Sequence, residues 1–299
     1  MRAIFYFLVT NLAVLILASL VFSVLSQFEF FQGMQGSMWG LLAFCAVFGI
    51  MGSFVSLLLS KKIAKWSSRT RIIKSPETAT EKWLVNAVNE MADREGIGRP
   101  EVGIFPSPAP NAFATGWNRN NALVAVSEGL LQQMNKEEVE AVLAHEVGHI
   151  TNGDMLIMTL IQGVLNTFVM FFARIFGFVV DAALRQRDER GGTGIGFFIG
   201  TIVAEIFLGL LASLVVFWFS RQREFRADAK AAELTSHDAM ISALKRLQVA
   251  AVPAHAQSGM PESMKAMGIS SGKRIQKASL FSTHPPLEQR IAVLEQSRI

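Results

Sequence analysis

The sequence predicts a mainly α-helical membrane protein, in which transmembrane helices accompany a cytosolic α+β domain with a small β-sheet. Three observations carry this prediction. Only 17% of the 299 residues are charged, whereas a soluble protein carries about 25%. The charges avoid several long apolar windows and gather in the remaining segments. One polar segment, 102–126, is β-prone and interrupted by proline and glycine, which is typical of short strands and turns.

The composition excludes several classes of protein. With 51% hydrophobic residues and a mean hydropathy of +0.35, the chain is neither a fully soluble enzyme nor a disordered tail protein. Its one cysteine, Cys45, lies inside an apolar run, so a disulfide framework and a cysteine-based zinc cluster are excluded. The net charge of +4 fits basic residues at membrane edges better than a nucleic-acid surface, so no nucleic-acid partner is expected.

The N-terminal region contains two apolar runs. Residues 4–26 and 38–60 each lack charge over 23 positions, enough for a helix to cross about 30 Å of hydrocarbon. A signal peptide is the alternative for the first run, but that run exceeds the roughly 7–15 apolar residues of a signal, which favours an uncleaved anchor. Residues 1–60 are therefore expected to form two transmembrane helices.

The distribution of basic residues predicts the orientation of these helices. The connection 27–37 carries only Glu29, whereas the segment after the second run is strongly basic. Its basic residues are Lys61, Lys62, Lys65, Arg69, Arg71 and Lys74. Since basic residues concentrate on the cytosolic side, the N-terminus and the chain after Ser60 are expected in the cytosol.

Two less regular apolar runs follow, Met155–Ala173 and Ile195–Phe219. Arg174 follows the first run, and Glu205 lies near the middle of the second. A transmembrane hairpin over 155–219 is the preferred interpretation, and a hairpin buried partly in protein or at the interface is the alternative. An even number of crossings returns the chain to the side it left.

The two soluble segments, 61–154 and 220–299, are therefore expected on one face of the membrane, with a cytosolic C-terminus. Together they would form one cytosolic body. Within it, residues 136–152, 221–235 and 286–296 are predicted to be helical, and 255–277 is predicted to be a loop.

The predicted helix 136–152 carries a motif with metal chemistry. Asn135 and Glu138 form a capping-box pattern at its start. His145 and His149 are four residues apart, so they share one helix face at a spacing that lets both imidazoles bind a single Zn²⁺. Glu146 follows the first histidine and is placed to act as general base, as in His-Glu-x-x-His metalloproteases.

The alternative is two surface histidines with a chance glutamate between them. This triplet would arise by chance in under roughly 1% of chains of this length, so the metal site is favoured.

A hydrolytic zinc site needs a third protein ligand and an open position. Glu224 and Asp228 follow the fourth apolar run and share one face of the predicted helix 221–235. One carboxylate can bind the metal while the other orients a ligand imidazole. The alternative is a solvated acidic pair among arginines.

These motifs together resemble the HtpX family of bacterial membrane-bound zinc metalloproteases, which is related to the CAAX prenyl proteases. The resemblance spans nearly the whole chain. Besides the apolar runs, it rests on Asn111–Gly116, His145–His149, Glu224–Asp228 and Thr283–Pro286. The combination of His-Glu-x-x-His with Glu-x-x-x-Asp after a hydrophobic hairpin is far more specific than either motif alone.

The resemblance implies a role for each matching position in a zincin-like domain. Glu224 matches the third ligand of one zinc ion per chain, and Asp228 matches the carboxylate that supports the site. His284 and Arg290 match residues near the site that could bind the oxyanion or the substrate backbone; alternatively, His284 and the prolines after it only open a C-terminal helix.

A further segment matches the family's substrate-binding strand, where an extended substrate can pair with the sheet. Its residues are Asn111, Ala112, Phe113 and Ala114. A structural turn or core strand is the alternative for this segment.

The expected function is that of a zinc metalloendopeptidase (EC 3.4.24 class) with a cytosolic site close to the membrane. Such a site suits cytosolic loops or tails of membrane proteins. The resemblance implies the bacterial inner membrane, quality control of misfolded or damaged membrane proteins under stress, and cooperation with other membrane quality-control proteases. A CAAX-type processing protease and a non-enzymatic zinc-binding membrane scaffold are the alternatives.

Overall fold

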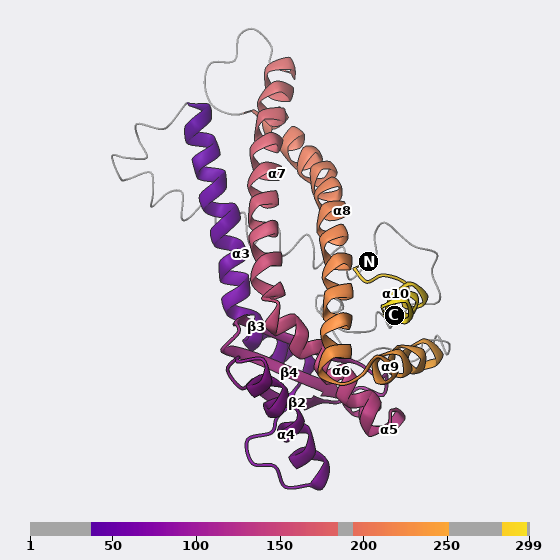
Figure 1. Cartoon of the computed structure of the whole chain (residues 1–299). Helices are drawn as coiled ribbons and strands as arrows, with labels where there is room; N and C mark the ends of the chain where they lie inside the picture. The colour runs from indigo at the N-terminus through magenta and orange to yellow at the C-terminus, as the bar shows by residue number, and fades with distance from the viewer. Residues whose placement is uncertain (1–36, 185–193, 251–282, 298–299) are drawn as a thin grey trace. The chain divides into compact units, whose positions relative to one another are not determined.

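The computed structural model describes residues 37–184, 194–250 and 283–297 (Figure 1). The helices are α3 (Met38–Ser68), α4 (Ala79–Arg94), α5 (Glu128–Gln133), α6 (Lys136–Thr151), α7 (Asp154–Leu184), α8 (Ile195–Leu234), α9 (His237–Ala250) and α10 (Leu287–Gln296). The strands are β1 (Arg71–Ile72), β2 (Glu101–Phe105), β3 (Ala112–Asn118) and β4 (Asn121–Ser127).

The chain divides into two compact units. The helical unit lies within residues 1–54 and 160–213, and the mixed unit lies within 55–159 and 214–299. The predicted first transmembrane helix (4–26) and the predicted loop 255–277 lie outside the described residues.

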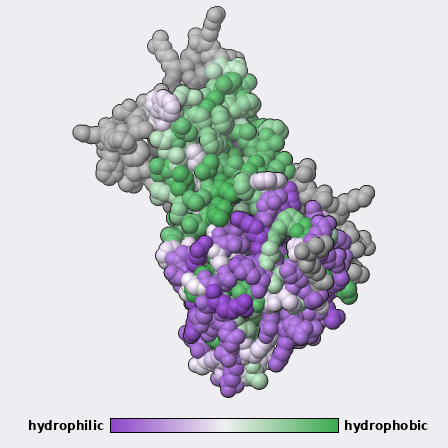
Figure 2. Space-filling view, viewed as in Figure 1, coloured by the Kyte–Doolittle hydropathy of each residue, from purple (hydrophilic) through white to green (hydrophobic). Residues whose placement is uncertain are grey.

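The helical unit has the surface of a membrane protein. In the described part of the chain, α3, α7 and α8 are long and apolar enough to cross a membrane. Their outer side chains are hydrophobic and exposed, for example Phe207 at 62% and Leu210 at 56%. Figure 2 shows a hydrophobic surface over these helices and a largely hydrophilic one over the mixed unit. These features confirm the predicted membrane fold class.

Small residues bring the helices of this unit close together. A Cβ atom on Gly49 of α3 would lie 2.5 Å from Thr167 Oγ1 of α7, and one on Gly200 of α8 would lie 2.9 Å from Val180 Cβ of α7. Close backbone approach at small residues is the usual packing of helices in lipid. The two charges inside the apolar runs face each other, with Arg174 Nη1 3.9 Å from Glu205 Oε1.

The mixed unit contains a four-stranded sheet in the order β1-β2-β4-β3. Strand β2 runs parallel to β4, whereas β3 is antiparallel to β4 and β1 to β2. Helix α6 packs against β3, α4 and α9, and α10 packs against α9. Leu84, Val124, Leu143 and Leu244 are fully buried in the resulting core. The small sheet predicted from residues 102–126 is thus confirmed.

Two predicted helices are found with their expected caps or bounds, and a third differs. The Asn135–Glu138 capping box starts α6, and α10 corresponds to the predicted helix 286–296. The predicted helix 221–235 is the last part of α8, which continues without a break from the apolar run. Hydropathy changes near Ser220, but no glycine or proline lies between residues 210 and 234 to end the helix.

Candidate metal and catalytic site

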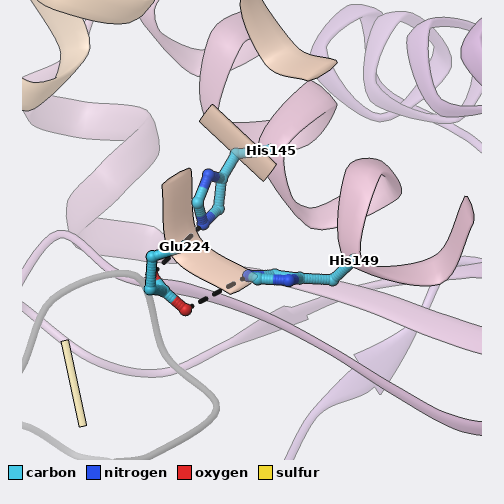
Figure 3. A group of neighbouring side chains, drawn as sticks. All are labelled: His145, His149 and Glu224. Carbon is cyan, nitrogen blue, oxygen red and sulfur yellow. Dashed lines mark ion pairs between the residues drawn. The ribbon is translucent and has the colours of Figure 1, made fainter. Parts of the chain in front are cut away.

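Three side chains from two helices converge in the mixed unit. His145 and His149 project from α6, and Glu224 projects from α8 (Figure 3). Glu224 Oε2 lies 3.7 Å from His145 Nε2, and Glu224 Oε1 lies 3.5 Å from His149 Nε2. One possible ligand atom from each residue lies within 4.8 Å of the others. The structure thus brings together the three residues predicted to bind zinc.

The chemistry of these atoms fits a metal ion. His145 Nε2 and Glu224 Oε1 are buried, yet neither has a hydrogen-bond partner among the residues that the structure describes. A buried polar atom without a partner is costly unless another group satisfies it. Two imidazoles and one carboxylate are the protein ligands of many catalytic zinc sites.

A glycine inside the motif lets the two helices approach. A Cβ atom on Gly148 would lie 3.3 Å from the side chain of Lys230 and 3.4 Å from the carbonyl oxygen of Ala227. The first distance is shorter than most Cβ contacts, and the second is at the limit of ordinary van der Waals contact. Gly148 therefore permits the α6–α8 separation at which Glu224 faces both histidines.

On the Nδ1 side of His145 lie a buried carboxylate, that of Asp228, and the guanidinium of Arg290. His145 Nδ1 is 2.9 Å from Asp228 Oδ1, and Arg290 Nε donates to Asp228 Oδ2 at 2.7 Å. Arg290 is completely buried. Burial opposes its charge, but Asp228 outweighs that effect and raises the pKa of Arg290. The structure thus places Asp228 beside a predicted ligand, and Arg290 hydrogen-bonds Asp228 twice and also contacts His145 and Glu224.

On the Nδ1 side of His149 lie a second carboxylate, that of Asp154, and the guanidinium of Arg226. His149 Nδ1 is 2.7 Å from Asp154 Oδ2, and Arg226 Nη2 is 3.2 Å from Asp154 Oδ1. Burial lowers the pKa of His149, but the hydrogen bond with Asp154 and the nearby carboxylate of Glu224 outweigh it and raise this pKa to about 9. The sequence analysis did not identify Asp154 or Arg226.

His284 comes from the segment just before α10. Its Nδ1 lies 2.8 Å from Glu224 Oε2, and Arg290 Nη1 lies 3.5 Å from the same oxygen. Burial would raise the pKa of Glu224, but the charge of His284 and the contacts with the histidines of α6 outweigh it and hold this pKa well below its usual range. Glu224 is therefore ionised, as a metal ligand must be.

Glu146 lies on α6 beside these residues and is 1% exposed. Both of its carboxylate oxygens are buried and lack a hydrogen-bond partner within the described ranges. Burial raises the pKa of Glu146. A carboxyl group with a raised pKa and open hydrogen-bonding capacity is suited to accept and release a proton.

The segment predicted to bind substrate lies at one side of the sheet. Ala112, Phe113 and Ala114 belong to β3, the last strand in the sheet order, and Asn111 directly precedes it. All four residues are buried. Helix α6 packs against β3, so this strand lies next to the metal-site helix.

Known proteins match this sequence over nearly their full length. Residues 78–298 match the model of peptidase family M48. The chain is 53% identical to Protease HtpX of Hahella chejuensis over 298 residues, covering 100% of both chains. It is 54% identical to Protease HtpX of Stutzerimonas stutzeri over 297 residues, covering 99% of each.

A solved structure shares the fold. The crystal structure of S. mikatae Ste24p matches with a TM-score of 0.60 and 18% sequence identity. The match covers 95% of this chain and 63% of that longer chain.

Proposed function

The chain belongs to peptidase family M48, and from this we propose that it is a zinc-dependent endopeptidase (EC 3.4.24 class) of a bacterial inner membrane. Its substrates would be misfolded or damaged membrane proteins, cut on the cytosolic side. Membership of the family, relatives named as proteases and three apolar helices make it a membrane metallopeptidase. The single observation that carries the finer proposal is the buried group of His145, His149 and Glu224 with Glu146 beside it.

One zinc ion per chain would be held by His145, His149 and Glu224. When bound, zinc acts as a Lewis acid that polarises the scissile carbonyl and lowers the pKa of water towards about 7. The donor set leaves a position for water, because a catalytic zinc site uses three protein ligands.

The proton transfers fall to Glu146. As a carboxylate it takes a proton from the attacking water, and as a carboxylic acid it returns that proton to the leaving amine. Burial, which favours the protonated form, stabilises the acid that exists between the two transfers. His284 and Arg290, both within 3.5 Å of Glu224 Oε2, would bind the oxyanion or the substrate backbone.

The substrate would bind as an added strand. Residues 111–114 lie at the outer strand of the sheet, where an extended backbone can pair. Because these residues are buried, pairing requires this edge to open. An unfolded segment of a membrane protein suits such a site better than a folded domain.

The proposed topology follows the charge distribution. Residues 1–60 would form two transmembrane helices and 155–219 a transmembrane hairpin. Residues 61–154 and 220–299 would form the cytosolic protease body, with both termini in the cytosol. The lipid bilayer and membrane-protein substrates would be its main partners, together with other quality-control proteases.

The deciding experiment compares two glutamate variants on one helix. Glu146→Gln should leave zinc bound but lower cleavage of an unfolded membrane-protein substrate by at least about 10²-fold, because the proton acceptor is lost. Glu137→Gln, an exposed position on α6, is the matched control and should keep full activity. Both detergent-purified variants would be assayed for bound zinc and for cleavage.

Other outcomes favour the alternatives. Zinc in both variants and the wild type without cleavage by any of them would favour the scaffold. Cleavage restricted to prenylated peptides would favour CAAX-type processing. Full activity of Glu146→Gln would remove the general-base assignment.

A further inference from the structure

We propose that Asp154, held by Arg226, is a positioning residue that fixes His149 in the tautomer and orientation needed to bind the metal. This inference rests on the proposed zinc site. It adds a second support to the one predicted from Asp228, and it assigns a role to a residue outside the recognised motifs.

The first step is the hydrogen bond itself. His149 can direct a lone pair from Nε2 towards the Glu224 side only if its other nitrogen, Nδ1, carries the proton. Nδ1 lies 2.7 Å from Asp154 Oδ2, and an ionised carboxylate only accepts. Asp154 thus selects the Nδ1–H tautomer and makes the imidazole a stronger ligand.

The second step is the turn that places Asp154. Helix α6 ends at Thr151, Asn152 is its C-cap, and Gly153 adopts a left-handed conformation with φ of 68°. Helix α7 begins at Asp154. This two-residue turn between α6 and α7 places the carboxylate of Asp154, five positions beyond His149, beside the His149 imidazole.

The third step is the charge balance of Asp154. The residue is 1% exposed, and a buried carboxylate needs compensation. Arg226 Nη2 lies 3.2 Å from its second oxygen, and the first turn of α7 contributes the positive end of a helix dipole. Arg226 lies two residues after Glu224, so α8 supplies both a ligand and the support of another ligand.

The test measures zinc affinity by competition with a chelator, and the visible spectrum of the Co²⁺-substituted protein. Asp154→Asn should weaken zinc binding about 10- to 100-fold and change the Co²⁺ spectrum, because a ligand imidazole is altered. Asp93→Asn, which breaks the exposed Asp93–Arg99 pair, is the matched control and should change neither. A purely structural role would lower stability without altering the Co²⁺ spectrum.

Arg226→Gln keeps the test decisive if Asp154→Asn does not fold. The Arg226 side chain is 56% exposed, so its replacement should be tolerated, and zinc affinity should fall about twofold to fivefold. Unchanged zinc affinity and an unchanged Co²⁺ spectrum in folded Asp154→Asn would overturn the proposal, as would unchanged affinity in Arg226→Gln if that is the only folded variant. A wild type that binds no zinc would instead overturn the proposed function.

Discussion

The two histidines of α6 each face an aspartate, but their surroundings differ. Each Nδ1 faces an aspartate, at 2.9 Å for His145 and 2.7 Å for His149, and each aspartate pairs with an arginine. We call these the His145 arm (Asp228, Arg290) and the His149 arm (Asp154, Arg226). The arginine of the His145 arm is 0% exposed, whereas the side chain of Arg226 is 56% exposed.

This difference in exposure predicts how much each arginine contributes to the stability of the protein. A buried guanidinium that loses its carboxylate, or a buried carboxylate that loses its guanidinium, leaves a charge that water cannot reach. The guanidinium of Arg226 is half exposed, so water can replace it beside Asp154, which also keeps its hydrogen bond with His149; removing Arg226 should therefore cost less. The His145 arm should therefore matter for folding, and the His149 arm mainly for the properties of the metal site.

The largest expected effect is on folding. Arg290→Met should lower the free energy of unfolding by about 3–5 kcal/mol, because it leaves Asp228 buried and unpaired by its main cation. Chemical denaturation in detergent would measure it. Arg226→Met, the matched change in the His149 arm, should lower it by about 1 kcal/mol or less. Equal losses would contradict the distinction between the arms.

The next effect is the coupling within each arm. A double-mutant cycle of Asp228→Asn and Arg290→Met should give a coupling free energy above about 1.5 kcal/mol, since these groups share two hydrogen bonds in a buried site. The corresponding cycle of Asp154→Asn and Arg226→Met should stay below about 1 kcal/mol. Unfolding of the single and double variants gives both values, and a stronger coupling in the His149 arm would reverse the comparison.

The smallest expected effect is the change of zinc affinity with salt concentration. Raising the ionic strength from about 0.05 M to about 0.5 M should weaken zinc binding by no more than a few-fold, through screening of the exposed Arg226. The Arg226→Gln variant should have lost this dependence. Chelator competition at both salt concentrations would measure it, and an identical slope in wild type and variant would show that screening acts elsewhere.

The sequence predicts one arm better than the other for a physical reason. His145, His149, Glu224 and Asp228 lie within helices, where a spacing of four places side chains on one face. The three predicted ligands are indeed brought together. Asp154 lies beyond the end of α6, and its position depends on the left-handed turn at Gly153. Helical periodicity ends before that turn, so it could not indicate Asp154.

The fold class was predictable because each of its signals is local. Apolar runs, a capping box and short β-prone segments depend on neighbouring residues. The continuity of α8 could not be predicted in the same way. The change of hydropathy near Ser220 marks a change of environment, but the backbone stays helical through it. Contacts such as that of His284 with Glu224 join residues 60 positions apart and required the three-dimensional structure.

Gly148 has a consequence for which ion the site accepts. The candidate ligands come from two helices, the histidines from α6 and Glu224 from α8, so the spacing of these helices affects the distance between Glu224 and the imidazoles. Gly148 has no side chain and therefore permits their close approach. A methyl group there would lie 3.3 Å from the Lys230 side chain, so Lys230 or α8 would have to shift by a few tenths of an ångström. A shift of α8 would also move Glu224 relative to the imidazoles. A small tetrahedral ion with bonds of about 2.0–2.1 Å would lose more by this than a larger ion with longer bonds. We therefore expect Gly148, which is not among the candidate ligands, to influence which ion fits this site.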